Sequence, residues 1–297
     1  MVEFYRTEPL NYEEVLKNII SGTKKYIGDK CCVLGISGGI DSTVTAAITK
    51  LAGIPLLGVS MPCSTNKEDE ITTAKLVGQE FCTEFKEVNL QNSFKEIEKF
   101  CTEVSGLEST PISQGNIKAR LRMITLYDLA SKKGGLVLDT DNLTEHFLGF
   151  FTIHGDCADF NPIGGLWKHE VYELARYLKE KVFPDSKALE ASIALIPTDG
   201  NGVKAGGDLA QIAPGKTYSD VDEILRAWVG LTKSIKGYVI DSDYQHGGFK
   251  ALCEKHGKET VKRVIQRSIG SEFKRRQAPL VCDIYHDSVL EKNGNII

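Results

Sequence analysis

The stretch CCVLGISGGIDSTVTAAITK, residues 31–50, constrains the fold more than any other part of the chain. An apolar run typical of a buried strand leads through Ser-Gly-Gly-Ile-Asp-Ser into a segment with helical periodicity. Gly53 ends that periodicity, whose apolar residues fall at i, i+3, i+4 and i+7: Val44, Ala47, Ile48 and Leu51. A buried strand that runs directly into an amphipathic helix is the unit from which parallel α/β sheets are built.

The same alternation recurs along the chain. Strand-like runs PLLGVSMP, EFKEVNL and GLVLDT are separated by segments of helical periodicity, and a helical stretch over residues 11–28 precedes them all. We therefore predict an α/β fold with a doubly wound parallel sheet and helices on both faces. In the helix NIKARLRMITLYDLA, the spacing predicts a buried stripe of Ile117, Leu121 and Ile124, with Lys118, Arg120 and Arg122 on other faces.

The composition and periodicity of the sequence change at residue 196. The segment IPTDGNGVKAGGDLAQIAPGKTY, residues 196–218, has five glycines and two prolines and no periodicity, which is typical of a functional lid or of disorder. SDVDEILRAWVG and KETVKRVIQRSIGSEFKRRQ follow and are predicted to be helical, the second one basic. With neither an internal repeat nor a linker in the sequence, we expect a single domain over residues 1–297.

Composition limits the function classes. A chain of 297 residues with 41% hydrophobic and 26% charged residues is an ordinary globular protein, and a net charge of -4 with a pI near 5.9 argues against a nucleic-acid partner. We expect a cytoplasmic protein without a membrane partner, because neither a leader pattern nor a long apolar run is visible. The eight cysteines are scattered without a C-x-x-C pair, so most are predicted to be buried, reduced thiols.

The turn between strand and helix has the chemistry of a phosphate site. Ligands of parallel sheets collect at the carboxyl ends of the strands, and Gly38 and Gly39 allow close backbone approach beside the free N–H groups of a helix start. Ser37, Ser42 and Thr43 add hydroxyl donors. The Asp41 carboxylate would repel a bare phosphate, so it indicates a Mg²⁺ ion between the two. The competing interpretation is a tight turn with a helix cap and no ligand.

No lysine follows the glycines, so the turn is not a P-loop. It resembles the pyrophosphate-binding loop of the ATP pyrophosphatases, which split ATP into AMP and pyrophosphate and have a Rossmann-like fold. This resemblance implies that ATP contacts a continuous run in the turn: Gly35, Ile36, Ser37, Gly38, Gly39, Ile40, Asp41 and Ser42.

Later motifs distinguish among the enzymes of that superfamily. QGNIKARLRMITLYDLAS, DTDNLTEHFLGFFTIHGD, ADFNPIGGLWKHEV, IPTD and SEFKRR follow in an order and spacing similar to the ammonia-dependent NAD synthetase family. The resemblance covers most of residues 30–280. It implies that ATP and Mg²⁺ are used to adenylate the carboxylate of nicotinic acid adenine dinucleotide (deamido-NAD), from which ammonia then displaces AMP. It also implies a homodimer.

The resemblance assigns roles residue by residue. Asp41 and Glu145 match the carboxylates that hold Mg²⁺, and with Lys168 they form the expected catalytic group. Further ATP contacts are implied at Met61, Thr140, Lys168 and Thr198. Substrate contacts are implied at Arg120, Asp159, Phe273 and Lys274.

Several departures from the family pattern concern the substrate side. Ile153 replaces a usual lysine, Phe273 replaces a usual histidine, and GDCAD is a shortened form of GDGGAD. Ser60 stands for a basic residue expected near the adenine. Nicotinate mononucleotide is therefore a competing substrate. Two competing functions also stay open: that of another ATP pyrophosphatase, such as a tRNA thiolase or GMP synthetase, and that of a regulatory module that holds ATP without turnover.

Overall fold

The predicted strands form one parallel sheet in the computed structural model of the chain. β1 (Cys32–Gly35) lies between β2 (Leu56–Ser60) and β4 (Leu136–Leu138), and β3 (Glu84–Glu87) forms an edge, which gives the order β3-β2-β1-β4. The structure describes residues 10–63, 66–156, 158–196, 207–231, 233–245, 247–275, 281–282 and 289–290. In the register, Leu34 lies beside Gly58 and Leu138.

Helices surround the sheet, and two short strands close the described chain. The first six helices are α1 (Tyr12–Ile27), α2 (Ile40–Leu51), α3 (Glu68–Phe81), α4 (Gln91–Ser105), α5 (Pro111–Lys133) and α6 (Leu143–Leu148). The next elements are α7 (Lys168–Tyr177), the π-helical turn η1 (Leu178–Val182), α8 (Lys187–Ala194), α9 (Gly207–Ile212) and α10 (Tyr218–Val229). The last are α11 (Lys233–Asp241), α12 (Gly248–His256), α13 (Lys258–Gly270), the 3₁₀ turn η2 (Glu272–Arg275), β5 (Val281–Cys282) and β6 (Val289–Leu290).

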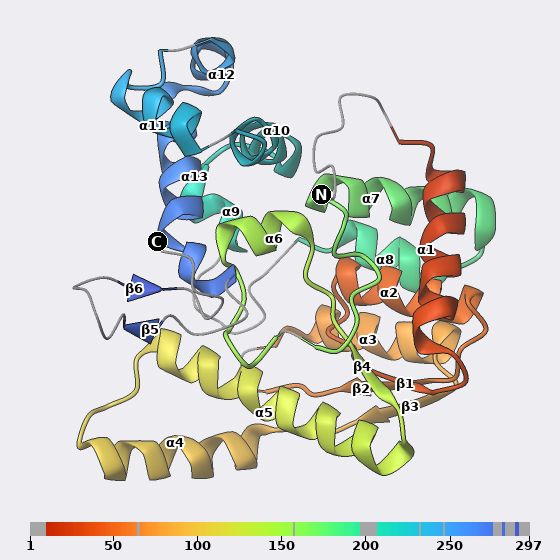
Figure 1. Cartoon of the computed structure of the whole chain (residues 1–297). Coiled ribbons are helices and arrows are strands. Elements are labelled where there is room, and N and C mark those ends of the chain that lie inside the picture. The colour runs from red at the N-terminus through yellow and green to blue at the C-terminus, as the bar shows by residue number, and fades with distance from the viewer. Residues whose placement is uncertain are drawn as a thin grey trace.

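Helices cover both faces of the sheet, as predicted (Figure 1). Cys32 and Leu34 point into a core shared with α1, α2, α3, α7 and α8. Val33, between them in sequence, points into a core that α5 covers from the other side, together with Val59 and Val137. Both faces of β1 are apolar because both are buried.

A third core holds the C-terminal helices together. It joins Leu143 and Leu148 of α6 and Trp167 to residues of α10, α12 and α13, such as Ile224 and Ile265. Figure 1 shows α10 to α13 grouped to one side of the sheet. This core fixes α6 and α7 relative to the helices that follow residue 207.

The strand order creates a crevice. The chain proceeds from β1 outward to β2 and β3, and then returns to place β4 on the other side of β1. The segments after β1 and β4 therefore leave the sheet in different directions. The crevice between them, at the carboxyl ends of the strands, is where open α/β sheets bind ligands.

One predicted helix face is only partly correct, because Leu121 packs against the core that contains Val33 but other residues of the face do not follow the prediction. Ile124 is 58% exposed, whereas Lys118 is buried with its ammonium 4.9 Å from the centre of the Phe94 ring. Besides Lys118, the buried residues of α5 are small ones, Gly115, Ala119 and Ala130, while Leu126 and Leu129 pack against the core at its edge. Small side chains let the helix approach its neighbours closely, so helical periodicity of large apolar residues did not identify this face.

Other expectations hold in part. The six cysteines described by their side chains are all free thiols, but of these only Cys32 and Cys63 are buried, and Cys101 is exposed. The helix α9 lies within the segment that lacked periodicity. In the described part of the chain, no helix is long and apolar enough to cross a bilayer.

Candidate active site

A cavity of about 340 Å³ occupies the crevice between β1 and β4. Its walls come from the turn between β1 and α2, the end of β2, the segment between β4 and α6, and the start of α7. Most residues predicted to contact ATP or Mg²⁺ line it: Gly35, Ile36, Ser37, Gly39, Ile40, Asp41, Ser42, Met61, Thr140, Glu145 and Lys168. Thr198 lies outside the described residues.

The glycine turn has the backbone geometry that its sequence indicates. Gly38 has φ +86°, a conformation that residues with a Cβ rarely adopt, and a Cβ there would lie 2.2 Å from the Glu70 carbonyl oxygen. Gly39 caps α2 in an extended conformation, with φ -69° and ψ 165°. The first N–H groups of α2 consequently face the cavity, where they can bind an anion.

Hydroxyl groups reinforce this turn. The Gly39 N–H donates to Ser37 Oγ over 3.1 Å, and Ser37 Oγ lies 3.1 Å from Ser42 Oγ. Thr43 Oγ1 donates to the Gly39 carbonyl oxygen over 2.9 Å. Ser37 and Ser42 line the cavity, whereas Thr43 supports the turn from behind.

Three charged groups from different elements meet at the cavity wall. The Lys168 ammonium donates to Asp41 Oδ2, and it also lies 3.0 Å from Glu145 Oε1. The side chain of Lys168 is only 6% exposed, against 15% for Asp41 and 24% for Glu145. One cation thus bridges the two carboxylates that the family resemblance pairs as metal ligands.

The two carboxylates keep the Lys168 ammonium protonated. Burial by itself lowers the pKa of the Lys168 ammonium, but the carboxylates of Asp41 and Glu145 outweigh it and hold that pKa well above its usual value. Burial raises the pKa of Glu145 to about 7, which the Lys168 ammonium opposes and the Asp41 carboxylate reinforces. An added cation or a proton would relieve the repulsion between the two carboxylates.

Acidic groups continue along the wall after β4. Burial is the main cause that raises the pKa of Asp139 to about 6, and burial with the nearby Asp139 carboxylate raises the pKa of Asp141. Asp139 Oδ1 accepts the N–H of Asp141 over 2.8 Å, which fixes the bend that leads to α6. Asp141 lines the cavity, so a cation bound beside it would reduce the repulsion among these carboxylates.

Asn142 is a site residue that the sequence analysis missed. Its Oδ1 accepts the N–H of Glu145 over 3.1 Å, and Glu145 Oε2 accepts the Asn142 N–H over 3.2 Å, which is a capping box. Its Nδ2 donates to Asp41 Oδ1 over 2.9 Å. The signal was the spacing Asn-x-x-Glu in DNLTEHF, which marks a helix start and places Glu145 in its first turn.

The donor set fits Mg²⁺ bound together with ATP. Asp41 and Glu145 direct carboxylate oxygens at one point, which the Lys168 ammonium now contacts, and hard cations prefer such oxygens. Among the described residues, no group of three or more His, Cys, Asp or Glu side chains is arranged to hold a metal by itself. Mg²⁺ normally takes one or two carboxylates and completes its shell with phosphate oxygens and water.

The residues predicted to contact the substrate lie outside this cavity. The Arg120 guanidinium donates to the carbonyl oxygen of Ile153 over 3.2 Å. Asp159 accepts the N–H of Val137 over 2.8 Å at the edge of β4. Phe273 is 59% exposed on η2.

The last of them, Lys274, contacts the protein itself. Its ammonium donates to the carbonyl oxygens of Gly149 and Phe151 over 2.8 and 2.6 Å. Arg267 and Arg275 donate to further carbonyl oxygens at the end of α6, those of Leu148 and Phe147, over 2.8 and 2.9 Å. Basic residues of the C-terminal segment thus neutralise the negative end of α6.

Comparison with known proteins identifies the family. The model of the NAD synthase family matches residues 12–278. An NH(3)-dependent NAD(+) synthetase of Fusobacterium nucleatum is 30% identical over 281 residues, which are 93% of this chain and 97% of that protein.

The chain belongs to the NAD synthase family.

Solved structures share the fold. An NMN synthetase from Francisella tularensis superimposes with a TM-score of 0.70 at 23% identity, covering 91% of this chain and 98% of that one. An NH3-dependent NAD synthetase from Campylobacter jejuni gives a TM-score of 0.66 at 24% identity, covering 92% and 100%. The predicted α/β class and the family resemblance are both confirmed.

Two positions bear on the departures from the family motifs. Ser60 lies in the cavity wall at the end of β2, and the Arg122 guanidinium of α5 enters the same wall and donates to the Met61 carbonyl oxygen over 3.3 Å. Arg122 was predicted to lie away from the buried side of α5, and that expectation is wrong. The Arg122 guanidinium therefore places a basic group near Ser60, and this group comes from the helix α5 and not from the strand β2.

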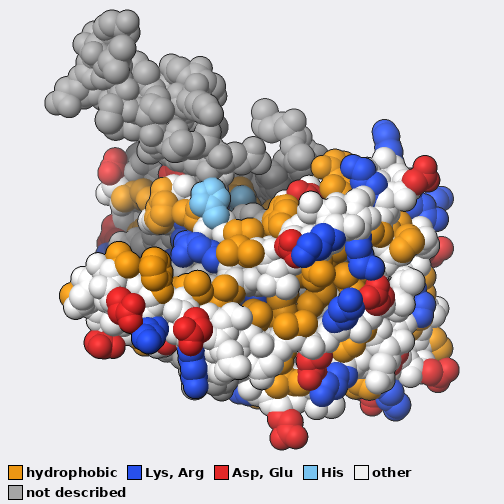
Figure 2. Space-filling view, turned by 90° about the horizontal axis from the view of Figure 1, so that it is seen from below, with side chains coloured by type: hydrophobic (Ala, Val, Ile, Leu, Met, Phe, Trp, Pro, Cys, Tyr) orange, Lys and Arg blue, Asp and Glu red, His pale blue; other side chains and the backbone are white. Residues whose placement is uncertain are grey.

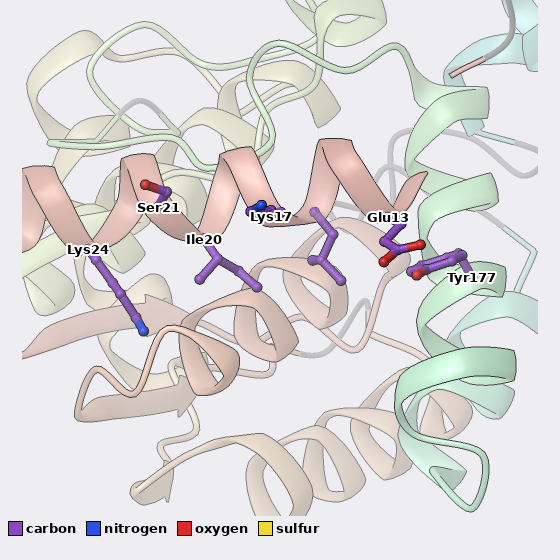
Figure 3. Close-up of a pocket in the computed structure, with 7 residues that line it drawn as sticks. Glu13, Lys17, Ile20, Ser21, Lys24 and Tyr177 are labelled. Carbon is purple, nitrogen blue, oxygen red and sulfur yellow. The ribbon is translucent and has the colours of Figure 1, made fainter. Parts of the chain in front are cut away.

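A second hollow, of about 460 Å³, is lined by residues of α1 and by Tyr177 at the end of α7 (Figure 3). Glu13, Lys17, Lys24 and Tyr177 are among the side chains around it. It adjoins neither the glycine turn nor the Lys168 cluster, so we do not assign the predicted chemistry to it.

The turn geometry predicts unequal effects of two neighbouring substitutions. Gly38→Ala should destabilise the fold by about 1–3 kcal/mol, because it forces a positive φ on alanine and a clash with the backbone at Glu70. Gly39→Ala should have a smaller effect, because its Cβ would meet only Ser37 Oγ, at 3.3 Å. Thermal unfolding of both variants tests this, and equal melting temperatures would contradict the turn geometry.

Proposed function

We propose that the chain is an ammonia-dependent NAD synthetase that uses ATP and Mg²⁺ to amidate deamido-NAD. The observation that carries the proposal is the meeting of Lys168, Asp41 and Glu145 beside a glycine turn at the helix start of α2. The family membership supports the reaction class, a ligase that forms a C–N bond.

The residues divide the work of the first step, in which the substrate carboxylate attacks the α-phosphorus of ATP and pyrophosphate leaves. The N–H groups at the start of α2, with Ser37 and Ser42, bind the phosphate oxygens. Asp41 and Glu145 would hold Mg²⁺, and the bound ion would supply positive charge close to the phosphate groups. The Lys168 ammonium, positioned between the two carboxylates, stabilises the negative charge that develops on the phosphate groups.

In the second step, ammonia attacks the acyl carbon of the adenylate, AMP leaves with the electron pair of the broken C–O bond, and the attacking nitrogen loses one proton as the amide forms. Esterification to AMP is what makes this attack feasible, because a free carboxylate has no good leaving group. Catalysis then consists of positioning and charge stabilisation, and it needs no nucleophilic side chain.

The identity of the acid is the finer part of the proposal. Arg120, Asp159 and Lys274 are assigned to the substrate side of the site, and the basic groups of Arg120 and Lys274 can engage the second phosphate of a dinucleotide. The mononucleotide is the second candidate, because one of the solved structures with this fold is described as an NMN synthetase. The superposition covers 98% of that chain.

We also propose a homodimer formed through α4 and α5. Apolar residues of α4 recur at i, i+3 and i+7 on its outer side, where Ile97, Phe100 and Val104 are 41%, 62% and 72% exposed. Ile112 and Ile124 of α5 are likewise 67% and 58% exposed. Figure 2 views the molecule from the side of these helices and shows hydrophobic side chains gathered between scattered charges. The cytoplasmic location stays a prediction.

The metal assignment predicts the behaviour of two carboxylate variants. Asp41→Asn and Glu145→Gln should each lower kcat by at least about 100-fold and leave the fold intact, because these side chains face the cavity. Glu173→Gln removes a surface carboxylate of α7 and serves as the matched control. The readout is pyrophosphate release, titrated with Mg²⁺, and wild-type turnover in either site variant would refute the assignment.

The substrate assignment predicts a preference between two acids. Deamido-NAD should exceed nicotinate mononucleotide by at least about tenfold in kcat/KM, or about 1.4 kcal/mol, because the additional AMP half can contact further basic residues. Ammonia should be the direct nitrogen donor. A side-by-side assay with ATP and Mg²⁺, and with ammonium or glutamine, decides both points. A mononucleotide preference would overturn the substrate, and efficient use of glutamine by the purified chain would overturn the donor.

The dimer proposal predicts a selective effect of charge on α4. Val104→Asp should shift the wild-type dimer to a monomer in sedimentation velocity, because an unpaired carboxylate would be buried in the interface. Ile240→Asp places the same charge on α11, at a residue that is 42% exposed, and should leave the dimer unchanged. A monomeric wild-type chain at micromolar concentration would contradict the proposal.

A further inference from the structure

A buried carboxylate on α10 contacts the site from behind, and the reaction described above does not use it. Asp222 is completely buried. It lies in the second turn of α10, the helix that follows the glycine-rich segment 196–218. A carboxylate buried this completely needs specific partners, because its desolvation is costly.

The partners of Asp222 are at the starts of α6 and α7. Its Oδ2 accepts the backbone N–H of His169 over 3.0 Å and lies 2.6 Å from Nδ1 of the His169 ring. Its Oδ1 accepts a hydrogen bond from the hydroxyl of Thr144. Asp222 therefore caps the first turn of α7 from a different helix.

Thr144 transmits this contact to the backbone of Lys168. Its Oγ1 accepts the Lys168 N–H over 2.9 Å and at the same time donates to Asp222. Thr144 precedes Glu145 in the first turn of α6. One carboxylate thus connects the helix that carries Lys168 to the helix that carries Glu145.

Charged side chains surround the junction, by which we mean the contact of Asp222 with the starts of α6 and α7. Arg226, one turn further along α10, pairs with Glu170 over 2.6 Å and lies 3.5 Å from Nε2 of His169. Glu170 Oε2 in turn accepts the Trp167 N–H over 2.9 Å. Tyr218, at the start of α10, places its ring 5.7 Å from the Lys168 ammonium. The same helix therefore supports Lys168 at its backbone and at its side chain.

We propose that Asp222 is a positioning residue of the amidation reaction, which holds the starts of α6 and α7 together so that Glu145 and Lys168 keep their spacing beside Asp41. The proposal rests on the roles assigned above to Asp41, Glu145 and Lys168. Asp222 contacts none of the reacting groups itself. It acts through Thr144 and the backbone of α7, as outer partners of a metal site orient its ligands.

A purely structural role makes a different prediction. If Asp222 only stabilised the fold, its replacement would lower the melting temperature while the folded enzyme kept its kcat and its Mg²⁺ requirement. If it positions the site, kcat should fall and the Mg²⁺ concentration for half-maximal activity should rise, even at temperatures where the variant is fully folded. KM for deamido-NAD should change little, because Asp222 is hydrogen-bonded to Thr144 and His169, which are not among the residues assigned to that substrate.

The main variant is Asp222→Asn, which keeps the size of the side chain and removes its charge. We expect a loss of about 10- to 100-fold in kcat and a comparable rise in the half-saturating Mg²⁺ concentration. Thr144→Val removes the hydroxyl without changing the shape, and it should reproduce both effects, whereas Thr144→Ser should retain near-wild-type kinetics. Combining Asp222→Asn with Thr144→Val should lower kcat by less than the product of the two single reductions, because both substitutions break the same connection.

Asp220→Asn is the matched control on the same helix. Asp220 accepts hydrogen bonds from the N–H and hydroxyl of Thr217, both over 2.8 Å, and lies 3.5 Å from His256. Its replacement should lower the melting temperature and leave the Mg²⁺ requirement unchanged.

The outcomes separate this inference from the site assignment. Unchanged kcat and Mg²⁺ requirement in folded Asp222→Asn overturn the positioning role while leaving the proposed reaction standing, provided that Asp41→Asn and Glu145→Gln are inactive. Active Asp41 and Glu145 variants overturn both. If Asp222→Asn does not fold, Thr144→Val decides, and wild-type kinetics in that variant overturn the inference.

Discussion

The ammonium of Lys168, held between two carboxylates, is the interaction on which the arrangement of this site depends. Asp41 comes from the first turn of α2 after β1, Glu145 from α6 after β4, and Lys168 from the start of α7. Strand pairing alone does not bring these three side chains together. The ion pairs span the crevice between β1 and β4. Removing the Lys168 ammonium would leave two carboxylates facing each other in a half-buried wall.

The sequence was sufficient to predict the sheet and the loop, because both are encoded locally. β1, β2 and β4 are short apolar runs, whereas the edge strand β3 has the sequence EFKE and is mostly exposed. The turn after β1 needs glycine at position 38 for a positive φ. Such features are visible in a window of a few residues. Family resemblance added the pairing of Asp41 with Glu145 and Lys168, which lie about a hundred residues or more from it, and the structure brings them together.

The features that were missed depend on packing between distant elements. Arg122 and Ile124 were assigned to the wrong sides of α5, because the buried residues of this helix include glycine and alanine, which carry little hydrophobic signal, and a lysine. Asp222 looked like one of several acids in SDVDEILRAWVG. Only the fold shows that its carboxylate is buried against His169 and Thr144. Hydrophobic periodicity indicates which side of a helix is buried, but it does not show which other helix those side chains contact.

The helix α6 connects the two halves of the proposed site. Its first turn presents Glu145 to Asp41 and Lys168. Its last carbonyl oxygens accept hydrogen bonds from Arg267 and Arg275, and Lys274 donates to the carbonyl oxygens of the segment that follows the helix. For Lys274 to grip a phosphate of the substrate, its ammonium must exchange those carbonyl oxygens for phosphate oxygens, a replacement of neutral acceptors by charged ones that favours the phosphate. The helix is only six residues long, so a change at its C-terminal end occurs within two turns of the carboxylate at its start. The segment proposed to bind the substrate and the proposed metal site are therefore linked through a single short helix.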